Sequence, residues 1–259
     1  IILAAGAGTR LEKYTKNLPK GMLNLLGKSL IERQIETLRE CDIKDITIVR
    51  GFQADKIRIP NVKYYVNKDY ENTNMVASLF CAEEELYGDV IVCYSDILYE
   101  KKAVKKMMDS KADIGVIVDD SYWDYWKARL DDPEEDIESL VIDDGRITKI
   151  GNPNCSLDKA QMRYVGLIKF SKKGVEALKK IFHENKKIYW DKEEPWLNSK
   201  SFKKAYMTDM LQALINSGYK VEPIIISHGW LEFDTISDYE RVIRWLEEKT
   251  LERFYSLDK

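Results

Sequence analysis

The chain begins with Ile1-Ile-Leu-Ala-Ala-Gly-Ala-Gly-Thr-Arg10, and this stretch, with Leu18-Pro19-Lys20 after it, decides how the rest is interpreted. The apolar residues 1–5 are typical of a buried parallel strand. The strand ends in Gly6-Ala7-Gly8, where small side chains let a ligand approach the backbone closely. We therefore expect a strand followed by a tight, ligand-binding turn.

Polar and basic residues stand at the mouth of this turn. Thr9 supplies a hydroxyl group, Arg10 supplies a fixed cation, and Lys20 adds a second, mobile positive charge. A loop of this kind turns backbone N–H groups toward an anion, and an arginine can grip a phosphate with two hydrogen bonds. The segment predicts a cradle for a nucleoside triphosphate. It is neither a dinucleotide fingerprint, which needs a third glycine, nor a Walker loop, because no Gly-Lys-Ser/Thr follows.

The composition is that of an ordinary folded protein. The 259 residues are 44% hydrophobic, and 41 basic residues against 44 acidic ones give a net charge of −3. This balance gives no reason to expect nucleic acid or an anionic membrane as a partner. No apolar run approaches the roughly 20 residues of a membrane-spanning helix. The four scattered cysteines suggest reduced thiols and a cytoplasmic protein.

Only two histidines are present, which argues against a zinc site and against a histidine-based catalytic triad. A metal in this protein should therefore be held by carboxylates, which favours a hard ion such as Mg²⁺.

Strand and helix patterns alternate along the chain, which predicts an α/β protein with three layers (α/β/α) and a mainly parallel mixed sheet. The apolar spacing predicts strands at 46–49, 62–66, 89–94, 114–118, 164–170 and 221–227, a hairpin at 141–147, and helices at 29–41, 75–87, 103–108, 175–182, 207–217 and 236–254.

We find no internal repeat or linker and expect one domain over 1–259. Residues 119–206, where the pattern changes, are expected to contribute a lid or insertion that binds an acceptor. The aromatic stretch 189–196 fits either an exposed loop or an interface between copies of the chain, so the oligomeric state stays open.

Three carboxylates are candidates for a metal site. Asp96 follows a buried strand, at the carboxyl end where open α/β sheets bind their ligands. Glu232 and Asp234 are two residues apart on an extended segment, so they point to the same face. Carboxylates that converge near a triphosphate would hold Mg²⁺ beside the α-phosphate.

The opening motif also resembles the signature of a known family. Leu3-Ala4-Ala5-Gly6-x-Gly8-Thr9-Arg10-Leu11 with Pro19-Lys20 is similar to nucleotidyltransferases that join a nucleoside triphosphate to a sugar phosphate or a phospho-alcohol. The resemblance implies a Rossmann-like (GT-A-like) fold, nucleotide binding by the residues of this motif, and catalytic roles for Arg10 and Lys20. It also implies that Asp96 and Asp234 share the metal. Glu232 corresponds to a further acid in the cytidylyltransferase branch.

Further segments resemble bacterial phosphocholine cytidylyltransferases and 2-aminoethylphosphonate cytidylyltransferases. They are Asp69–Leu79, Tyr125-Trp126-x-x-Arg129, Tyr206-Met-Thr-Asp209 and Gly229–Thr235. The resemblance implies that Asn74 and Ser78 lie near the base and ribose. It further implies that Trp126 and Tyr206 bind the cationic head of the acceptor.

Chemistry adds two acceptor-binding candidates. Asp209 could complete a pocket for an ammonium group, to which aromatic rings are also attracted. Arg129 could hold the acceptor phosphate or phosphonate as a two-pronged fork, or instead form a surface salt bridge with the acidic stretch that follows it.

Together with the residues above, the resemblance implies an Mg²⁺-dependent enzyme that transfers CMP from CTP to phosphocholine or 2-aminoethylphosphonate and releases pyrophosphate. The choice of CTP as the donor rests on the resemblance. One alternative is a sugar-1-phosphate uridylyl- or thymidylyltransferase, and a second is an inactive regulatory subunit that binds a nucleotide. The segments rich in Trp and Tyr favour an amine-bearing acceptor over a sugar. The complete set of Gly6, Gly8, Arg10, Lys20, Asp96 and Asp234 argues against the inactive subunit.

Overall fold

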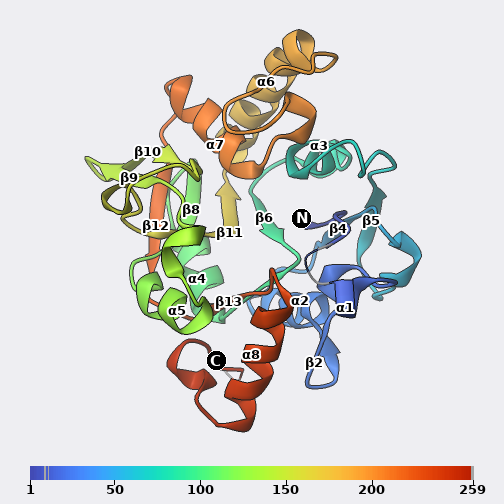
Figure 1. Cartoon of the computed structure of the whole chain (residues 1–259). Helices are drawn as coiled ribbons and strands as arrows, with labels where there is room; N and C mark the ends of the chain where they lie inside the picture. Colours follow the sequence, from blue (N-terminus) through green and yellow to red (C-terminus); the bar gives the residue numbers. More distant parts are fainter. Residues whose placement is uncertain (9, 11, 258–259) are drawn as a thin grey trace.

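A computed structural model describes residues 1–8, 10 and 12–257. Its centre is a seven-stranded sheet with the strand order β12-β8-β11-β6-β1-β4-β5 (Figure 1). The strands of this sheet are β1 (Ile2–Ala4), β4 (Thr47–Arg50), β5 (Lys63–Val66), β6 (Val90–Tyr94), β8 (Ile114–Asp119), β11 (Arg163–Phe170) and β12 (Glu222–Ile226). The order of strands departs from the order of the sequence because helices cross over between them.

The sheet is parallel except at one strand. β1 pairs in parallel with β4 and β6, β4 with β5, and β8 with β12. β11 runs antiparallel to both of its neighbours, β6 and β8. The mainly parallel mixed sheet expected from the sequence is confirmed. As a consequence, β11 brings its amino end to the edge where the parallel strands end.

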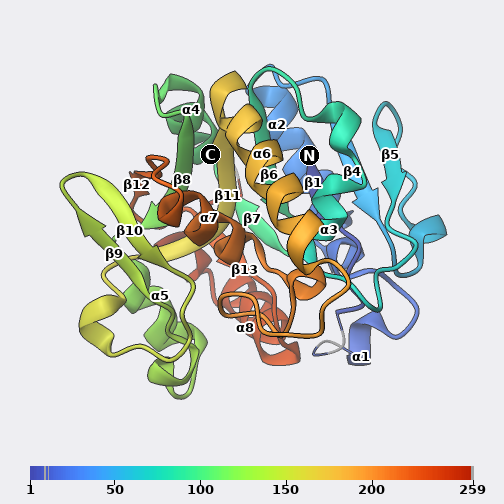
Figure 2. The same ribbon diagram turned by 90° about the horizontal axis from the view of Figure 1, so that it is seen from above.

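Helices cover both faces of the sheet and make the three layers (Figure 2). One core packs α2 (Leu30–Glu40), α4 (Lys101–Asp109), α5 (Tyr122–Arg129) and α8 (Ile236–Glu247) against the sheet. The other core contains α3 (Met75–Phe80), α6 (Lys172–Tyr189) and α7 (Met207–Asn216). A short helix, α1 (Glu12–Thr15), follows the first loop.

Three two-stranded ribbons flank the sheet. They pair β2 (Asn24–Leu25) with β3 (Lys28–Ser29), β7 (Ile97–Tyr99) with β13 (Trp230–Glu232), and β9 (Leu140–Asp143) with β10 (Arg146–Ile150). The last ribbon is the hairpin expected at 141–147. The β7–β13 pair matters most for function. It holds β13 beside β7, so that Asp234, two residues after β13, lies near the end of β6.

Some predicted boundaries were wrong. The helix expected over 75–87 ends at Phe80, and a 3₁₀ turn follows at Glu83–Glu85. The helix expected over 236–254 ends at Glu247, because Lys249 adopts a positive φ of 59° and reverses the chain. Helix α5 was not predicted, because aromatic and charged residues are mixed around the whole helix and leave no regular apolar pattern.

Residues 119–206, expected to form a lid, also contain β11. Because β11 lies between β6 and β8 in the central sheet, this range supplies part of the core as well as loops around the site. Within the described part of the chain, none of the helices combines the length and the apolar character needed to cross a bilayer.

Helix α2 begins with a complete capping box. The Ser29 hydroxyl accepts a hydrogen bond from the backbone N–H of Glu32 at 3.2 Å, and the Glu32 carboxylate accepts one from the Ser29 N–H at 2.7 Å. We predict that Ser29→Ala lowers the free energy of unfolding by about 1 kcal/mol in urea titrations, because one N-terminal N–H loses its partner. Ser29→Thr, which keeps the hydroxyl, should recover most of this stability; an unchanged Ser29→Ala variant would contradict the role of the cap.

Candidate functional site

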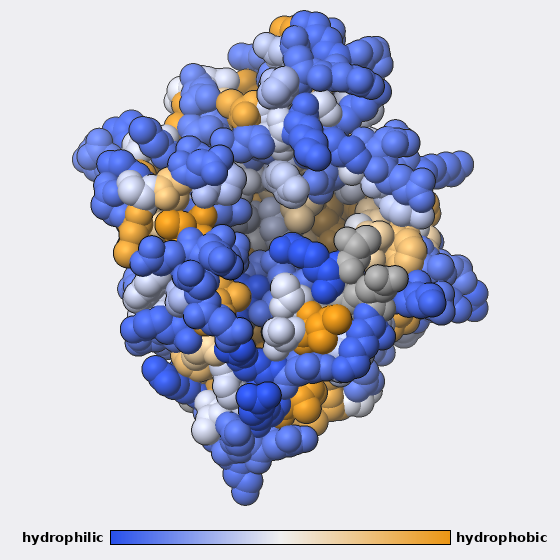
Figure 3. Space-filling model, viewed as in Figure 1, coloured by the Kyte–Doolittle hydropathy of each residue, from blue (hydrophilic) through white to orange (hydrophobic). Residues whose placement is uncertain are grey.

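A cleft of about 750 Å³ opens at the carboxyl ends of β1 and β6. Figure 3 shows it as the hollow near the middle of the face seen in Figure 1. Its size is that of a ligand pocket, which typically encloses about 300–1,000 Å³. Twelve of the residues predicted for the site line it: Leu3, Ala5, Gly6, Gly8, Arg10, Lys20, Asn74, Ser78, Asp96, Tyr206, Glu232 and Asp234.

The loop after β1 packs tightly against Lys20. Gly8 has a positive φ of 62°, and a Cβ atom built there would lie 3.1 Å from the Cβ of Lys20. The hydroxyl of Thr15 donates a hydrogen bond of 2.9 Å to the Gly8 carbonyl and fixes the loop from its other side. Glycine is therefore required at position 8 by both the backbone conformation and the close approach of Lys20.

Lys20 lies between two of the predicted metal ligands. Its Nζ atom is 2.6 Å from Asp96 Oδ2 and 2.5 Å from Asp234 Oδ1. Arg10 adds a contact of 3.2 Å from Nη2 to Asp234 Oδ1, with its side chain 67% exposed at the cleft mouth. Groups that lie 76 and 214 residues from Lys20 thus meet in one ion-pair cluster.

The charges in this cluster hold one another in their ionised forms. Burial disfavours the ammonium group, but Asp96 and Asp234 outweigh burial and raise the pKa of Lys20 to about 12. Burial likewise disfavours the Asp234 carboxylate, yet Lys20 and Arg10 lower the pKa of Asp234 to about 2. The cleft therefore presents fixed positive and negative groups side by side.

The predicted base and ribose residues are organised by Asn67, a buried residue that sequence reasoning missed. The Asn67 amide donates hydrogen bonds of 2.9 Å to the hydroxyls of Thr73 and Ser78, and its oxygen accepts one from the Asp69 N–H. The Ser78 hydroxyl in turn donates to the carbonyl of Asn74, the N-cap residue of α3. This network fixes the loop along one wall of the cleft.

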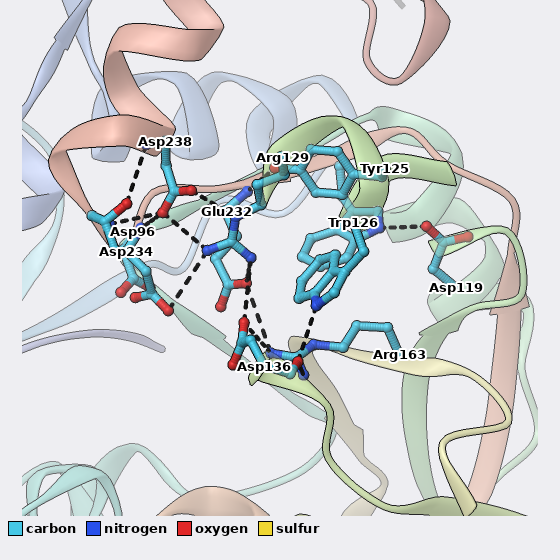
Figure 4. Close-up of polar contacts among 12 residues, drawn as sticks. Asp96, Asp119, Tyr125, Trp126, Arg129, Asp136, Arg163, Glu232, Asp234 and Asp238 are labelled. Atoms are coloured by element: carbon cyan, nitrogen blue, oxygen red, sulfur yellow. Dashed lines mark hydrogen bonds and ion pairs between the residues drawn. The ribbon is translucent and has the colours of Figure 1, made fainter. Parts of the chain in front are cut away.

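Arg129 does not line the cleft. It is buried and forks onto Asp238, with Nε 2.8 Å from Oδ1 and Nη2 3.0 Å from Oδ2 (Figure 4). Its Nη1 atom lies 2.6 Å from Glu232 Oε2. The predicted contact with an acceptor phosphate was wrong, because both ends of the guanidinium are paired inside the protein. The predicted pairing with the acidic stretch is present, as a contact of 3.8 Å from Nη1 to Asp136 Oδ2, but Arg129 is buried rather than at the surface. Burial raises the pKa of Glu232, and Arg129 opposes this rise.

Trp126 was also wrongly placed in the acceptor pocket. It has no exposed surface, and its indole N–H donates to the carbonyl of Asp136 at 3.0 Å. The guanidinium carbons of Arg129 and Arg163 lie 4.6 and 4.4 Å from the centre of its ring. The attraction between a cation and an aromatic face is present, as the sequence suggested, but the cations are the chain's own arginines.

Two further predicted residues belong to the framework, and a third was not described. Asp209 is completely buried at the start of α7, where it accepts hydrogen bonds from the backbone N–H groups of Asn198 and Tyr206 and from the Ser199 hydroxyl. It therefore fixes the loop that carries Tyr206, which is 48% exposed in the cleft. Ala4 points into the core between sheet and helices. Thr9 lies outside the described residues.

Several cleft residues come from places that the sequence rules do not favour. Arg163 and Tyr164 begin β11, whose amino end reaches the cleft because the strand is antiparallel. Asp136 and Glu138 come from the loop before β9, which the sequence showed only as an acidic stretch. The rule that ligands bind at the carboxyl ends of parallel strands therefore predicts neither Arg163 and Tyr164 nor Asp136 and Glu138 as cleft residues.

The donor set fits a hard divalent cation only together with a ligand. In the described residues no cluster of three or more His, Cys, Asp or Glu side chains forms a metal cage by itself. Asp96 and Asp234 nevertheless offer carboxylate oxygens on either side of one point, now bonded to Lys20. Mg²⁺ is commonly held by one or two carboxylates plus substrate phosphates, so these two residues suit it.

Comparison with known proteins places the chain in a family. Residues 1–189 match the MobA-like NTP transferase domain. The chain belongs to this family of NTP transferases. It is 33% identical over 252 residues to CTP:phosphoglutamine cytidylyltransferase of Campylobacter jejuni, with 93% of this chain and 97% of that protein covered. It is 26% identical over 203 residues to 2-aminoethylphosphonate cytidylyltransferase of Lancefieldella rimae, with 74% and 76% covered.

The fold of this NTP transferase also matches solved structures. The structure of CTP:phosphocholine cytidylyltransferase from Streptococcus pneumoniae superposes with a TM-score of 0.69 over 95% of this chain and 97% of that one. The sequence identity in that pair is 23%, so this likeness concerns the fold. The Rossmann-like nucleotidyltransferase fold expected from the sequence is confirmed.

The buried ion pairs of Arg129 generate a stability prediction. We predict that Arg129→Gln lowers the free energy of unfolding by about 3–5 kcal/mol, because Glu232 and Asp238 lose their buried counter-charge. Urea unfolding measures this. Arg146→Gln, which removes an exposed pair with Asp144, is the matched control and should cost no more than about 0.5 kcal/mol. Equal losses in the two variants would contradict the structural role of Arg129.

Proposed function

We propose that this NTP transferase transfers CMP from CTP to a small phosphorylated or phosphonate acceptor that carries an amine, and releases pyrophosphate. The observation that carries the proposal is the meeting of Arg10, Lys20, Asp96 and Asp234 at one point of a large cleft. Relatives named for cytidylyl transfer to phosphoglutamine and to 2-aminoethylphosphonate support CTP as the donor.

The reaction is a direct in-line displacement. An oxygen of the acceptor phosphate or phosphonate forms a bond to the α-phosphorus of CTP while the bond from that phosphorus to the bridging oxygen of pyrophosphate breaks. The nucleophile is already an anion, so no side chain has to remove a proton. The protein contributes orientation and neutralisation of charge, which are the main resources of phosphoryl-transfer enzymes.

The residues divide these tasks between them. The Gly6–Gly8 loop and Arg10 bind the triphosphate at the carboxyl end of β1, and Lys20 supplies a cation inside the cleft. Asp96 and Asp234 would hold Mg²⁺, which when bound neutralises phosphate oxygens and polarises the α-phosphorus. The same two carboxylates accept hydrogen bonds from Lys20, so the ammonium group and the metal would compete for their oxygens.

A panel of nucleotides and acceptors tests the proposal. Each of CTP, UTP, dTTP and ATP is combined with phosphocholine, 2-aminoethylphosphonate, other aminoalkyl phosphates and sugar 1-phosphates, and pyrophosphate release is measured with Mg²⁺. We predict release with CTP and an amine-bearing acceptor, and its loss when EDTA removes the metal. Release that requires UTP or dTTP with a sugar 1-phosphate would replace the proposed reaction by the alternative one.

Two substitutions test the cluster itself. We predict that Lys20→Ala and Asp96→Ala each lower kcat by about 10²–10³-fold, because each removes a charge that stabilises the transition state. Their unfolding transitions should remain cooperative. Lys111→Ala, an exposed lysine between α4 and β8, is the control and should leave turnover unchanged. Turnover of either cleft variant within a few-fold of the wild type would contradict its role.

A further inference from the structure

One end of the cleft carries charged side chains that the transfer of CMP does not use. Asp136, Glu138 and Arg163 line this end, together with Tyr164. In Figure 4, Asp136 and Arg163 lie on the far side of Glu232 from Asp96 and Asp234. We call Asp136, Glu138 and Arg163 the head-group wall. It lies in the same cleft as the reacting groups but apart from them, where the remote end of an acceptor would reach.

Arg163 has hydrogen-bonding capacity to spare. It is only 8% exposed, and its Nη1 atom donates one hydrogen bond of 3.1 Å to the Asp136 carbonyl. Its Nε atom is buried without a partner among the described residues. Its Nη2 atom is 3.6 Å from Asp136 Oδ2 and 3.9 Å from Glu232 Oε2, too far for hydrogen bonds. A buried donor without a partner destabilises the protein, and a hydrogen-bond acceptor on a ligand would offset this cost.

The position of Arg163 is fixed rather than adaptable. Its guanidinium carbon lies 4.4 Å from the centre of the buried Trp126 ring. Burial disfavours its charge, but Glu232, Glu138 and Asp136 together raise the pKa of Arg163. A guanidinium that is stacked, charged and incompletely bonded is suited to a carboxylate, which it can bind with two parallel hydrogen bonds.

The two carboxylates of the head-group wall are suited to a positively charged group on a ligand. Glu138 is half-buried and makes no hydrogen bond or ion pair with the residues that the structure describes. Among the described residues, the side-chain carboxylate of Asp136 has only long contacts, 3.6 Å to Arg163 and 3.8 Å to Arg129. Arg129 pairs more closely with Asp238 and Glu232, at 2.8 and 2.6 Å, so these two acids already balance its charge. The wall therefore has one more negative than positive charge and is suited to an ammonium group.

We propose that the head-group wall selects acceptors whose far end carries both an ammonium and a carboxylate group, as an α-amino acid does. Glu138 and Asp136 bind the ammonium, and Arg163 binds the carboxylate. This inference rests on the proposed function, because it concerns the acceptor of that reaction. A site with hydrogen-bonding groups of both kinds discriminates strongly against analogues that lack either one, because its own groups are then left without partners.

Three acceptors that keep the same spacing from the phosphonate to the amine or the carboxylate test the proposal. 2-Amino-4-phosphonobutyrate carries both groups, 3-aminopropylphosphonate lacks the carboxylate, and 4-phosphonobutyrate lacks the amine. Each is supplied with CTP and Mg²⁺, and kcat/KM is measured by pyrophosphate release. We expect the first compound to exceed each of the others by at least about tenfold. Equal values, or a preference for 3-aminopropylphosphonate, would overturn the inference and leave the proposed function standing.

Variants of Glu138 and Arg163 test which side chain binds the ammonium group and which binds the carboxylate. Glu138→Gln should raise KM for the amino compounds about tenfold or more, while KM for CTP and for 4-phosphonobutyrate stays unchanged. Arg163→Lys keeps the charge but loses the fork, so it should abolish the advantage of 2-amino-4-phosphonobutyrate over 3-aminopropylphosphonate. Glu135→Gln, an exposed acid in the same stretch, is the matched control. Glu138→Gln with an unchanged acceptor preference would overturn the assignment.

The assays also distinguish failure of the proposed CMP transfer from failure of the head-group wall. If no acceptor releases pyrophosphate from CTP, the transfer reaction is wrong, and the preference of the wall is then measured by calorimetric binding of the three compounds. Tighter binding of 2-amino-4-phosphonobutyrate than of the other two would still support the wall, and equal or absent binding would overturn it.

Discussion

The structure depends on one constraint: two carboxylates can share a partly buried cleft only when a cation lies between them. Asp96 follows β6, Asp234 follows β13, and Lys20 follows the loop after β1, so three separate elements must end at one point. Lys20 holds the two acids together at 2.6 and 2.5 Å, and they keep its ammonium charged in return. The sheet order, with β1 beside β6, is what makes this meeting possible.

A second set of buried charges fixes the approach to this point. Asp238 accepts hydrogen bonds from the backbone N–H groups of Asp234 and Thr235 at 2.8 and 2.7 Å. The same carboxylate receives the fork of Arg129 from α5. Arg129 therefore acts on the cleft through Asp234, whose backbone it holds by way of Asp238 and whose Oδ2 lies 3.9 Å from its own Nη2. The aromatic ring of Trp126 beneath both arginines connects this framework to the head-group wall.

Local signals in the sequence were enough to predict a mainly parallel sheet and the residues that meet in the cluster of Arg10, Lys20, Asp96 and Asp234. The run 1–5, the glycine turn and the acid after 89–94 depend on neighbours in the chain and on the rule that parallel strands end at one edge. Arg129 and Trp126 were misassigned because their partners, Asp238 and Arg163, lie far away in the sequence. Arg163 itself was missed because the antiparallel direction of β11 left no mark in the apolar pattern.

Equilibrium binding of CTP with and without Mg²⁺ tests the central claim most directly, because it isolates the cluster from the choice of acceptor. If Asp96 and Asp234 hold the metal against the triphosphate, Mg²⁺ should tighten the binding of CTP to the wild type by about tenfold or more, which corresponds to about 1.4 kcal/mol. The double variant Asp96→Asn, Asp234→Asn should lose this gain. The same gain from Mg²⁺ in both proteins would contradict the account.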